Sequence, residues 1–214
     1  MSSDKHTHDH HHDHQHDHSH LTDTEARVRA LETVLSAKGY IDSDAVDEIV
    51  QTYETKIGPQ NGAHVIAKSW TDQTYKEWLQ TDSTAAIHSL GYTSRQGEHI
   101  DAVFNSDDVH HLVVCTLCSC YPWSVLGLPP TWYKSPPYRS RVVIDPRGVL
   151  EDFGLSFPAT TKVEVHDSTS EIRYLVIPQR PAGTEGWSEE QLAKLVTRNS
   201  MIGTGLATKP EDQA

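Results

Sequence analysis

The three cysteines of this sequence, Cys115, Cys118 and Cys120, all lie within one stretch of six residues. An odd number of cysteines argues against a framework of disulfide bonds, and a bridge between Cys118 and Cys120 would close a strained loop across one residue. Thiolates at this spacing are typical ligands of transition metals. The spacing therefore predicts a metal site in a reducing compartment, for which the cytoplasm is the expected location.

The ligand set of this cluster is incomplete if only side chains are counted. Structural zinc normally takes four side chains, and an iron–sulfur cluster also needs a fourth cysteine. His110 and His111 face opposite sides of a predicted strand, so at most one of them can contribute. A loop as tight as Cys118-Ser119-Cys120 brings two backbone nitrogens, those of Ser119 and Cys120, within reach of the same ion. Because peptide nitrogens ligate only when deprotonated, a strongly polarising trivalent low-spin ion is favoured over zinc or magnesium.

A strand must position the cluster. Residues 100–104 alternate between apolar and polar side chains, residues 105–108 are typical of a turn, and residues 109–114 are rich in β-branched side chains. This pattern predicts a β-hairpin whose second strand runs directly into Cys115.

Helices are predicted before this strand. A capping box formed by Thr22 and Glu25 opens a helix that Gly39 ends, and a second helix covers residues 43–57. Three shorter helices are expected between residues 60 and 90. The first two helices carry a narrow apolar stripe, which packs either on a core of their own or on a partner chain.

Further helices and strands follow the cysteines. The sequence predicts a helix over residues 145–153, strands over 162–166 and 171–177, and a last helix that begins at a capping box formed by Ser188 and Gln191. The fold class is therefore α+β. We expect a tail over residues 1–20, a helical arm over 21–90, and an α/β metal-binding catalytic domain over 91–214.

The tail holds nine of the fifteen histidines, interleaved with aspartates. It cannot bury a core and is expected to be disordered, acting either as a loose binder of divalent metals or as a solvated tail. The net charge of -12 argues against nucleic acid and anionic membranes as partners. The chain shows no apolar stretch long enough to span a membrane and no apolar signal segment, so the expected location is the cytoplasm.

The stretch Val114–Trp123 resembles the metal-binding signature of nitrile hydratase α subunits. Residues 126–134, 138–143 and 175–184 are also similar to this family, and the resemblance covers roughly residues 22–206. It implies the metal-binding α subunit of a cobalt-type nitrile hydratase, an enzyme that adds water to a nitrile to give an amide. It also implies a layered α-β-β-α domain with the metal loop after a β-strand.

The resemblance further implies how the metal is held. Cys115 is the axial thiolate, Cys118 is oxidised to a sulfinic acid and Cys120 to a sulfenic acid, and the amide nitrogens of Ser119 and Cys120 complete five donors. The sixth position is open for water or substrate. Thr116 stands where iron-type members carry serine, so the resemblance implies cobalt(III) rather than iron(III).

Other site residues are implied in the same way. Gln96 and Trp123 match a glutamine and an aromatic wall near the family's active site, and with Tyr121 and Cys120 they form the expected catalytic set. Either the Cys120 oxygen or a water activated by the ion is the expected nucleophile.

Two carboxylates, Asp167 and Glu171, match residues that support the site from a distance. Read as ordinary structure, they are instead a turn-capping aspartate and a salt-bridged glutamate. His166 stands where relatives usually carry tryptophan, so local packing there is expected to differ.

The resemblance implies a β subunit as partner, in an αβ heterodimer or a dimer of such heterodimers. Arginines from that subunit would neutralise the oxidised sulfurs. A cobalt metallochaperone and a small nitrile substrate are also implied. The alternatives are a thiocyanate hydrolase with the same metal centre and a non-catalytic metal carrier.

Overall fold

The computed structural model describes residues 23–55, 58–93, 99–118 and 120–213. The described residues divide into two compact units, one that ends at Glu48 and one that begins at Ile49. Two helices, α1 (Asp23–Ala37) and α2 (Ser43–Thr55), confirm the first two predicted helices. Gly39 follows α1 with a positive φ of 68°. The capping box at Thr22 lies outside the described residues, as does the whole predicted tail.

Three short helices follow in direct succession: α3 (Pro59–Thr71), α4 (Gln73–Thr81) and α5 (Ser83–Ser89). An aspartate at each junction begins the next helix. The Asp72 carboxylate accepts from the backbone N–H of Tyr75 at 3.0 Å, and that of Asp82 accepts from the N–H of Ala85 at 2.9 Å. These caps explain why one helical pattern is divided into separate helices.

The strands are β1 (His99–Phe104), β2 (Val109–Val114), β3 (Lys162–Asp167) and β4 (Ile172–Ile177). The predicted hairpin is wrong: β1 pairs in parallel with β4, and β2 pairs in parallel with β3. The turn at 105–108 exists, since Ser106 donates its N–H to the Val109 carbonyl at 2.9 Å. Alternating side chains predict a strand but not its partner, and here both strands pair with segments far along the chain.

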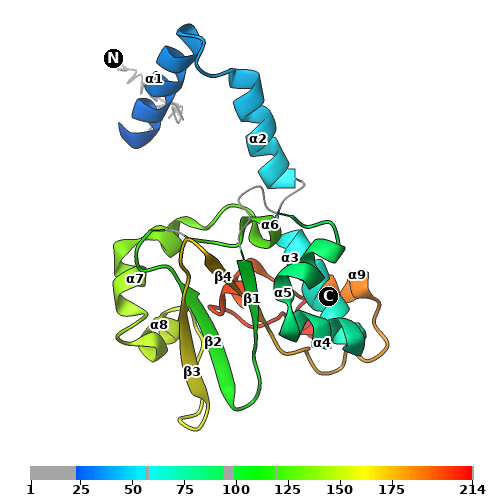
Figure 1. Ribbon diagram of the computed structural model, residues 1–214. Helices are drawn as coiled ribbons and strands as arrows, with labels where there is room; N and C mark the ends of the chain where they lie inside the picture. Colours follow the sequence, from blue (N-terminus) through cyan, green and yellow to red (C-terminus); the bar gives the residue numbers. More distant parts are fainter. Residues whose placement is uncertain (1–22, 56–57, 94–98, 119, 214) are drawn as a thin grey trace, which may run out of the picture. The chain divides into compact units, whose positions relative to one another are not determined.

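The remaining helices are α6 (Trp123–Leu126), α7 (Pro136–Arg141), α8 (Pro146–Asp152), α9 (Glu189–Ala193) and α10 (Arg198–Ile202), with 3-10 turns at Thr131–Lys134 and Pro210–Gln213. In Figure 1, α7 and α8 lie on one side of the strands and α9 lies on the other side near α3. Of these, α8 confirms a predicted helix, and α9 begins at the predicted capping box of Ser188 and Gln191. The prediction that this helix is the last one is wrong, because α10 follows it.

One hydrophobic core joins these helices to the strands. Helices α4 and α5 contact β1, α8 contacts β3, and α10 contacts β4. Helix α3 contributes Val65 and Ile66 to the same core as Leu112 of β2 and Leu175 of β4. Helices α3 to α5, expected in the arm, therefore share the core of the strands. The fold is a mixture of helices and strands, as predicted. Within the described part of the chain, no helix is long and apolar enough to cross a bilayer.

Gly203 lets the end of α10 approach β2 closely. It caps α10 with a φ of 93°, and a Cβ atom there would collide with the backbone carbonyl of His111. Its own carbonyl accepts a hydrogen bond from Nε2 of the buried His110 at 2.7 Å. Only glycine satisfies both the backbone conformation and the contact.

We expect Gly203→Ala to lower the free energy of unfolding by about 3–5 kcal/mol, because backbone strain and a backbone collision add together. Gly154→Ala is the matched control, since Gly154 has a similar φ of 80° and open space around it; it should cost only about 1–2 kcal/mol. Urea or thermal unfolding of both variants measures the difference, and equal losses would contradict the close approach.

Candidate metal centre

The cysteine loop begins where two parallel strands end together. Val114, the last residue of β2, is in register with Asp167, the last residue of β3. The Asp167 carboxylate accepts two hydrogen bonds from Thr116, from its backbone N–H at 2.9 Å and its hydroxyl at 2.5 Å. The N–H of Ser168 also donates to the Val114 carbonyl at 2.7 Å. The first turn of the loop is thereby tied to β3.

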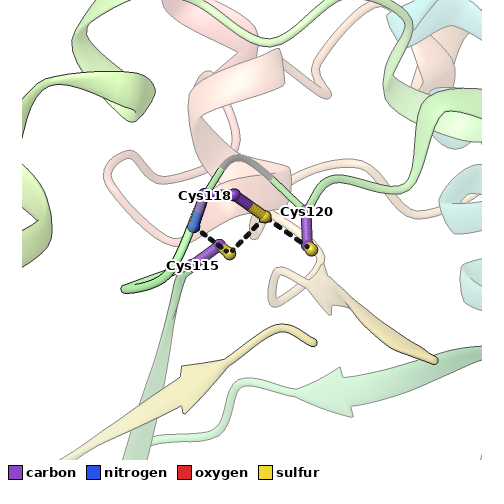
Figure 2. Close-up of side chains that lie close together, drawn as sticks. All are labelled: Cys115, Cys118 and Cys120. Carbon is purple, nitrogen blue, oxygen red and sulfur yellow. Dashed lines mark hydrogen bonds between the residues drawn. The ribbon is translucent and has the colours of Figure 1, made fainter. Parts of the chain in front are cut away.

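The three sulfurs converge at this loop (Figure 2). The Sγ atoms of Cys115 and Cys118 lie 3.6 Å apart, those of Cys118 and Cys120 lie 3.2 Å apart, and all three lie within 4.8 Å of one another. Two sulfurs in adjacent positions on one ion, each about 2.3 Å from it, lie about 3.3 Å apart. These two pairs therefore have nearly the spacing of neighbouring ligands on one ion, and the third sulfur lies within reach of the same ion. All three cysteines are described, and none is joined in a disulfide.

Burial divides the loop into an inner and an outer part. Cys115 and Cys120 are buried, whereas Cys118 and the neighbouring Leu117 are exposed. Burial and the two neighbouring thiols together raise the pKa of the Cys120 thiol to about 12, and the positive charge of Arg173 acts in the opposite direction. Since a metal binds the thiolate, loading this site releases protons.

Two side chains hold the loop through its carbonyl oxygens, and a third holds the strand before it. Tyr133 donates its hydroxyl to the Cys120 carbonyl at 3.0 Å, and Arg139 donates to the Cys118 carbonyl at 3.1 Å. Tyr138 donates to the carbonyl of Val113, in the strand that leads to the loop, at 2.7 Å. Burial raises the pKa values of both tyrosines, which keeps their hydroxyls protonated as donors.

Sequence reasoning assigned no role to these three residues. They lie in or beside an irregular proline-rich stretch, where neither periodicity nor spacing predicts which side chain reaches the loop. The only signal was that their segments resembled the same family as the cysteine motif.

The structure places the other predicted site residues at different depths. Tyr121 is buried with its ring 5.1 Å from that of Tyr133, and Trp123 begins α6 and packs against the core. Glu171 is exposed just before β4, and its backbone carbonyl accepts from the N–H of His99 at 3.1 Å. Of the two predicted carboxylates, Asp167 is thus the one that contacts the loop. Gln96 and Ser119 lie outside the described residues.

Three sulfurs on a short loop at the end of a strand define a thiolate site for one transition-metal ion. The sequence matches the family model "Nitrile hydratase, alpha chain" over residues 22–205. The chain belongs to this family.

Individual relatives agree with this family. The chain is 60% identical over 192 residues to the high-molecular-weight cobalt-containing nitrile hydratase subunit alpha of Rhodococcus rhodochrous, covering 89% of this chain and 95% of that protein. The fold of the present chain is similar to that of a double mutant of the iron-type nitrile hydratase from Comamonas testosteroni Ni1. That comparison gives a TM-score of 0.82 and 37% identity, and it covers 87% of this chain and 91% of the other.

The chain is also similar to a subunit of thiocyanate hydrolase, the alternative enzyme. The γ subunit of thiocyanate hydrolase from Thiobacillus thioparus is 38% identical over 197 residues, covering 87% of this chain and 81% of that protein. This is a much more distant match than the nitrile hydratase subunit.

The pair Asp167 and Thr116 can be tested by a double-mutant cycle. We expect Asp167→Ala to lower both the metal content and the free energy of unfolding more than Thr116→Val does, because it removes both hydrogen bonds. The coupling energy should be about 1 kcal/mol, as for an exposed charge-assisted hydrogen bond. Elemental analysis and unfolding of the purified chain measure the two effects.

The matched control is Glu151→Ala, which removes an exposed carboxylate on α8. It should change neither quantity. If the effects of the two single variants proved additive, the hydrogen bond from the Thr116 hydroxyl to Asp167 would not stabilise the loop.

Proposed function

We propose that the chain is the metal-binding α subunit of a cobalt-type nitrile hydratase, which hydrates nitriles to amides. One observation carries the proposal: the Sγ atoms of Cys115, Cys118 and Cys120 lie within 4.8 Å of one another on the loop that gives the family its signature. The backbone nitrogens of Ser119 and Cys120 would complete the set of donors. The Rhodococcus relative, which is named as cobalt-containing, supports cobalt(III) as the ion.

Bound cobalt(III) would supply a Lewis acid that polarises a nitrile or lowers the pKa of a water molecule. The chain's own residues prepare the site for it. Buried Cys115 anchors the loop, and Asp167 fixes Thr116, so little conformational freedom remains to be lost when an ion binds. Exposed Cys118 leaves the outer side of the loop open to a substrate or a partner.

We propose that Cys118 carries a sulfinic acid and Cys120 a sulfenic acid in the active protein. Oxidised Cys120 would place a nucleophilic oxygen at the buried end of the loop. Trp123 and Tyr121 would then form the aromatic side of the site, with Gln96 as a further polar contact.

Exposed apolar side chains of this chain support the presence of a partner subunit. Leu117 is 85% exposed beside Cys118, and Val28, Leu31 and Val34 form an exposed apolar stripe on α1. The β subunit of nitrile hydratase is the proposed partner for both surfaces, in an αβ heterodimer. The charge of Arg173 in this chain already acts on Cys120, and further arginines from that subunit are proposed to neutralise the oxidised sulfurs.

The same proposal includes the layering of the domain, the delivery of cobalt and the cellular location. The two strand pairs would form the inner layers of an α-β-β-α domain, behind a helical arm and the histidine-rich tail. A metallochaperone would deliver cobalt. Three thiols without a disulfide partner support a reducing compartment, the cytoplasm.

Co-expression with the β subunit in cobalt-supplemented medium tests the function. We expect one cobalt per chain, hydration of acrylonitrile, and little hydrolysis of thiocyanate. Mass spectrometry of the peptide containing residues 115–120 should show about 48 Da of added oxygen, which is one sulfinic and one sulfenic group. Cys118→Ser should lose both cobalt and hydration. Zinc bound to three unmodified thiols would overturn the proposal, and preferential thiocyanate hydrolysis would favour the alternative.

The tail has a separate expected role. Interleaved histidines and aspartates can hold divalent ions loosely and raise their concentration near the loop. Deletion of residues 1–20 should therefore lower cobalt occupancy when cobalt is limiting and leave it unchanged when cobalt is abundant. Unchanged occupancy under both conditions would show that the tail does not supply metal.

A further inference from the structure

A second group of metal-ligating side chains lies on β2 and β3, away from the cysteines. It comprises His111, Glu164 and His166, whose ligand atoms all lie within 4.8 Å of one another. His111 is in register with Glu164, and His166 follows two residues later on β3. Since side chains alternate along a strand, all three project from the same face of the strand pair.

We propose that His111, Glu164 and His166 bind a divalent cation of the late first transition series, such as Zn²⁺, Co²⁺ or Ni²⁺. Two imidazoles and one carboxylate are a common donor set for these ions, which leave further positions to water. This site is separate from the proposed cobalt(III) centre and does not depend on hydratase activity.

The distances fit one ion. His111 Nδ1 lies 2.8 Å from His166 Nε2 and 3.7 Å from the nearer Glu164 oxygen. Two donors each about 2.0–2.2 Å from a metal lie about 2.9–3.5 Å apart, depending on the angle between them. To bind one ion, the distance between His111 and His166 must lengthen and that between His111 and Glu164 must shorten, each by a few tenths of an ångström. Rotation of the side chains can provide this change.

The surroundings hold the imidazoles neutral and oriented. Burial lowers the pKa of both histidines, which favours the form with a lone pair for a metal. The His166 ring packs 4.9 Å from that of Tyr174 and 5.0 Å from that of His111, which restricts the orientation of both imidazoles.

The charges around the site are mixed. Lys162 Nζ lies 2.5 Å from a Glu164 oxygen, and the negative charge of Asp101 acts on His166. Lys162 is 68% exposed, so its ion pair is weak and can be released when a cation arrives. The Asp101 charge favours a cation.

The position of the site gives it a structural consequence. His111 precedes Cys115 by four residues, which is roughly 13 Å along an extended strand, so the two sites cannot share an ion. His166 directly precedes Asp167, which holds Thr116. A cation bound here would cross-link β2 and β3 directly before the cysteine loop.

A zinc titration of the cobalt-loaded complex, followed by thermal unfolding, tests the proposal. An ion that binds only the folded state raises the melting temperature. An ion that binds the folded and unfolded chains equally, as at the histidines of residues 1–20, does not. We expect Zn²⁺ at 100 times its dissociation constant to raise the melting temperature by roughly 5 °C or more. Glu164→Gln and His166→Gln should each abolish this rise and remove one zinc per chain.

The control is His88→Gln, which replaces an exposed histidine of α5 and should retain the full rise. Glu164→Gln keeps the shape of the side chain and removes only a weak exposed ion pair with Lys162, so its metal-free melting temperature should stay near that of the unchanged protein. The absence of a zinc-dependent rise, or an equal rise in both site variants, would show that the three residues form only a hydrogen-bond network. Loss of cobalt or of hydration would bear on the proposed function and not on this site.

Discussion

The parallel pairing of β2 with β3, completed by the hydrogen bonds of Asp167 to Thr116, is the constraint on which the cysteine loop depends. Parallel strands end at the same edge of a sheet, so the last residue of β3 lies where β2 becomes irregular. Its carboxylate binds both donors of Thr116 and thereby fixes the direction in which the loop leaves the strand. Cys115 is then buried under the loop, and the chain must turn back within a few residues.

The remaining supports of the loop act on its carbonyl groups. Tyr133 and Arg139 donate to the carbonyls of Cys120 and Cys118. These contacts orient the peptide planes and make no use of the loop's amide nitrogens. Peptide nitrogens that bind an ion must be deprotonated, and supports that act on carbonyl oxygens do not compete with the ion for them. Buried tyrosines suit this task because they stay neutral and donate a single hydrogen bond.

Sequence reasoning succeeded where the signal is local. Gly39 and the Ser188 capping box mark helix ends through interactions within a few residues, and the cysteine spacing indicates a metal site from equally local information. It failed at the β1–β2 hairpin, because alternation specifies the faces of a strand and not its neighbour. Tyr133 reaches the loop by tertiary packing, which is invisible in sequence order. His111 and His166, 55 residues apart, meet only through the register of β2 and β3.

The strand pair thus presents two donor sets of different chemistry, three thiols at its end and two imidazoles with a carboxylate along its face. Thiolates with amidate nitrogens stabilise a small trivalent ion that exchanges slowly. Neutral imidazoles and a single carboxylate bring one negative charge, which suits a divalent ion that exchanges readily. Because the donor types differ, one kind of metal ion is not expected to bind equally well at both sites. The chemistry of the side chains, more than the shape of the backbone, therefore decides which metal each part of β2 and β3 can hold.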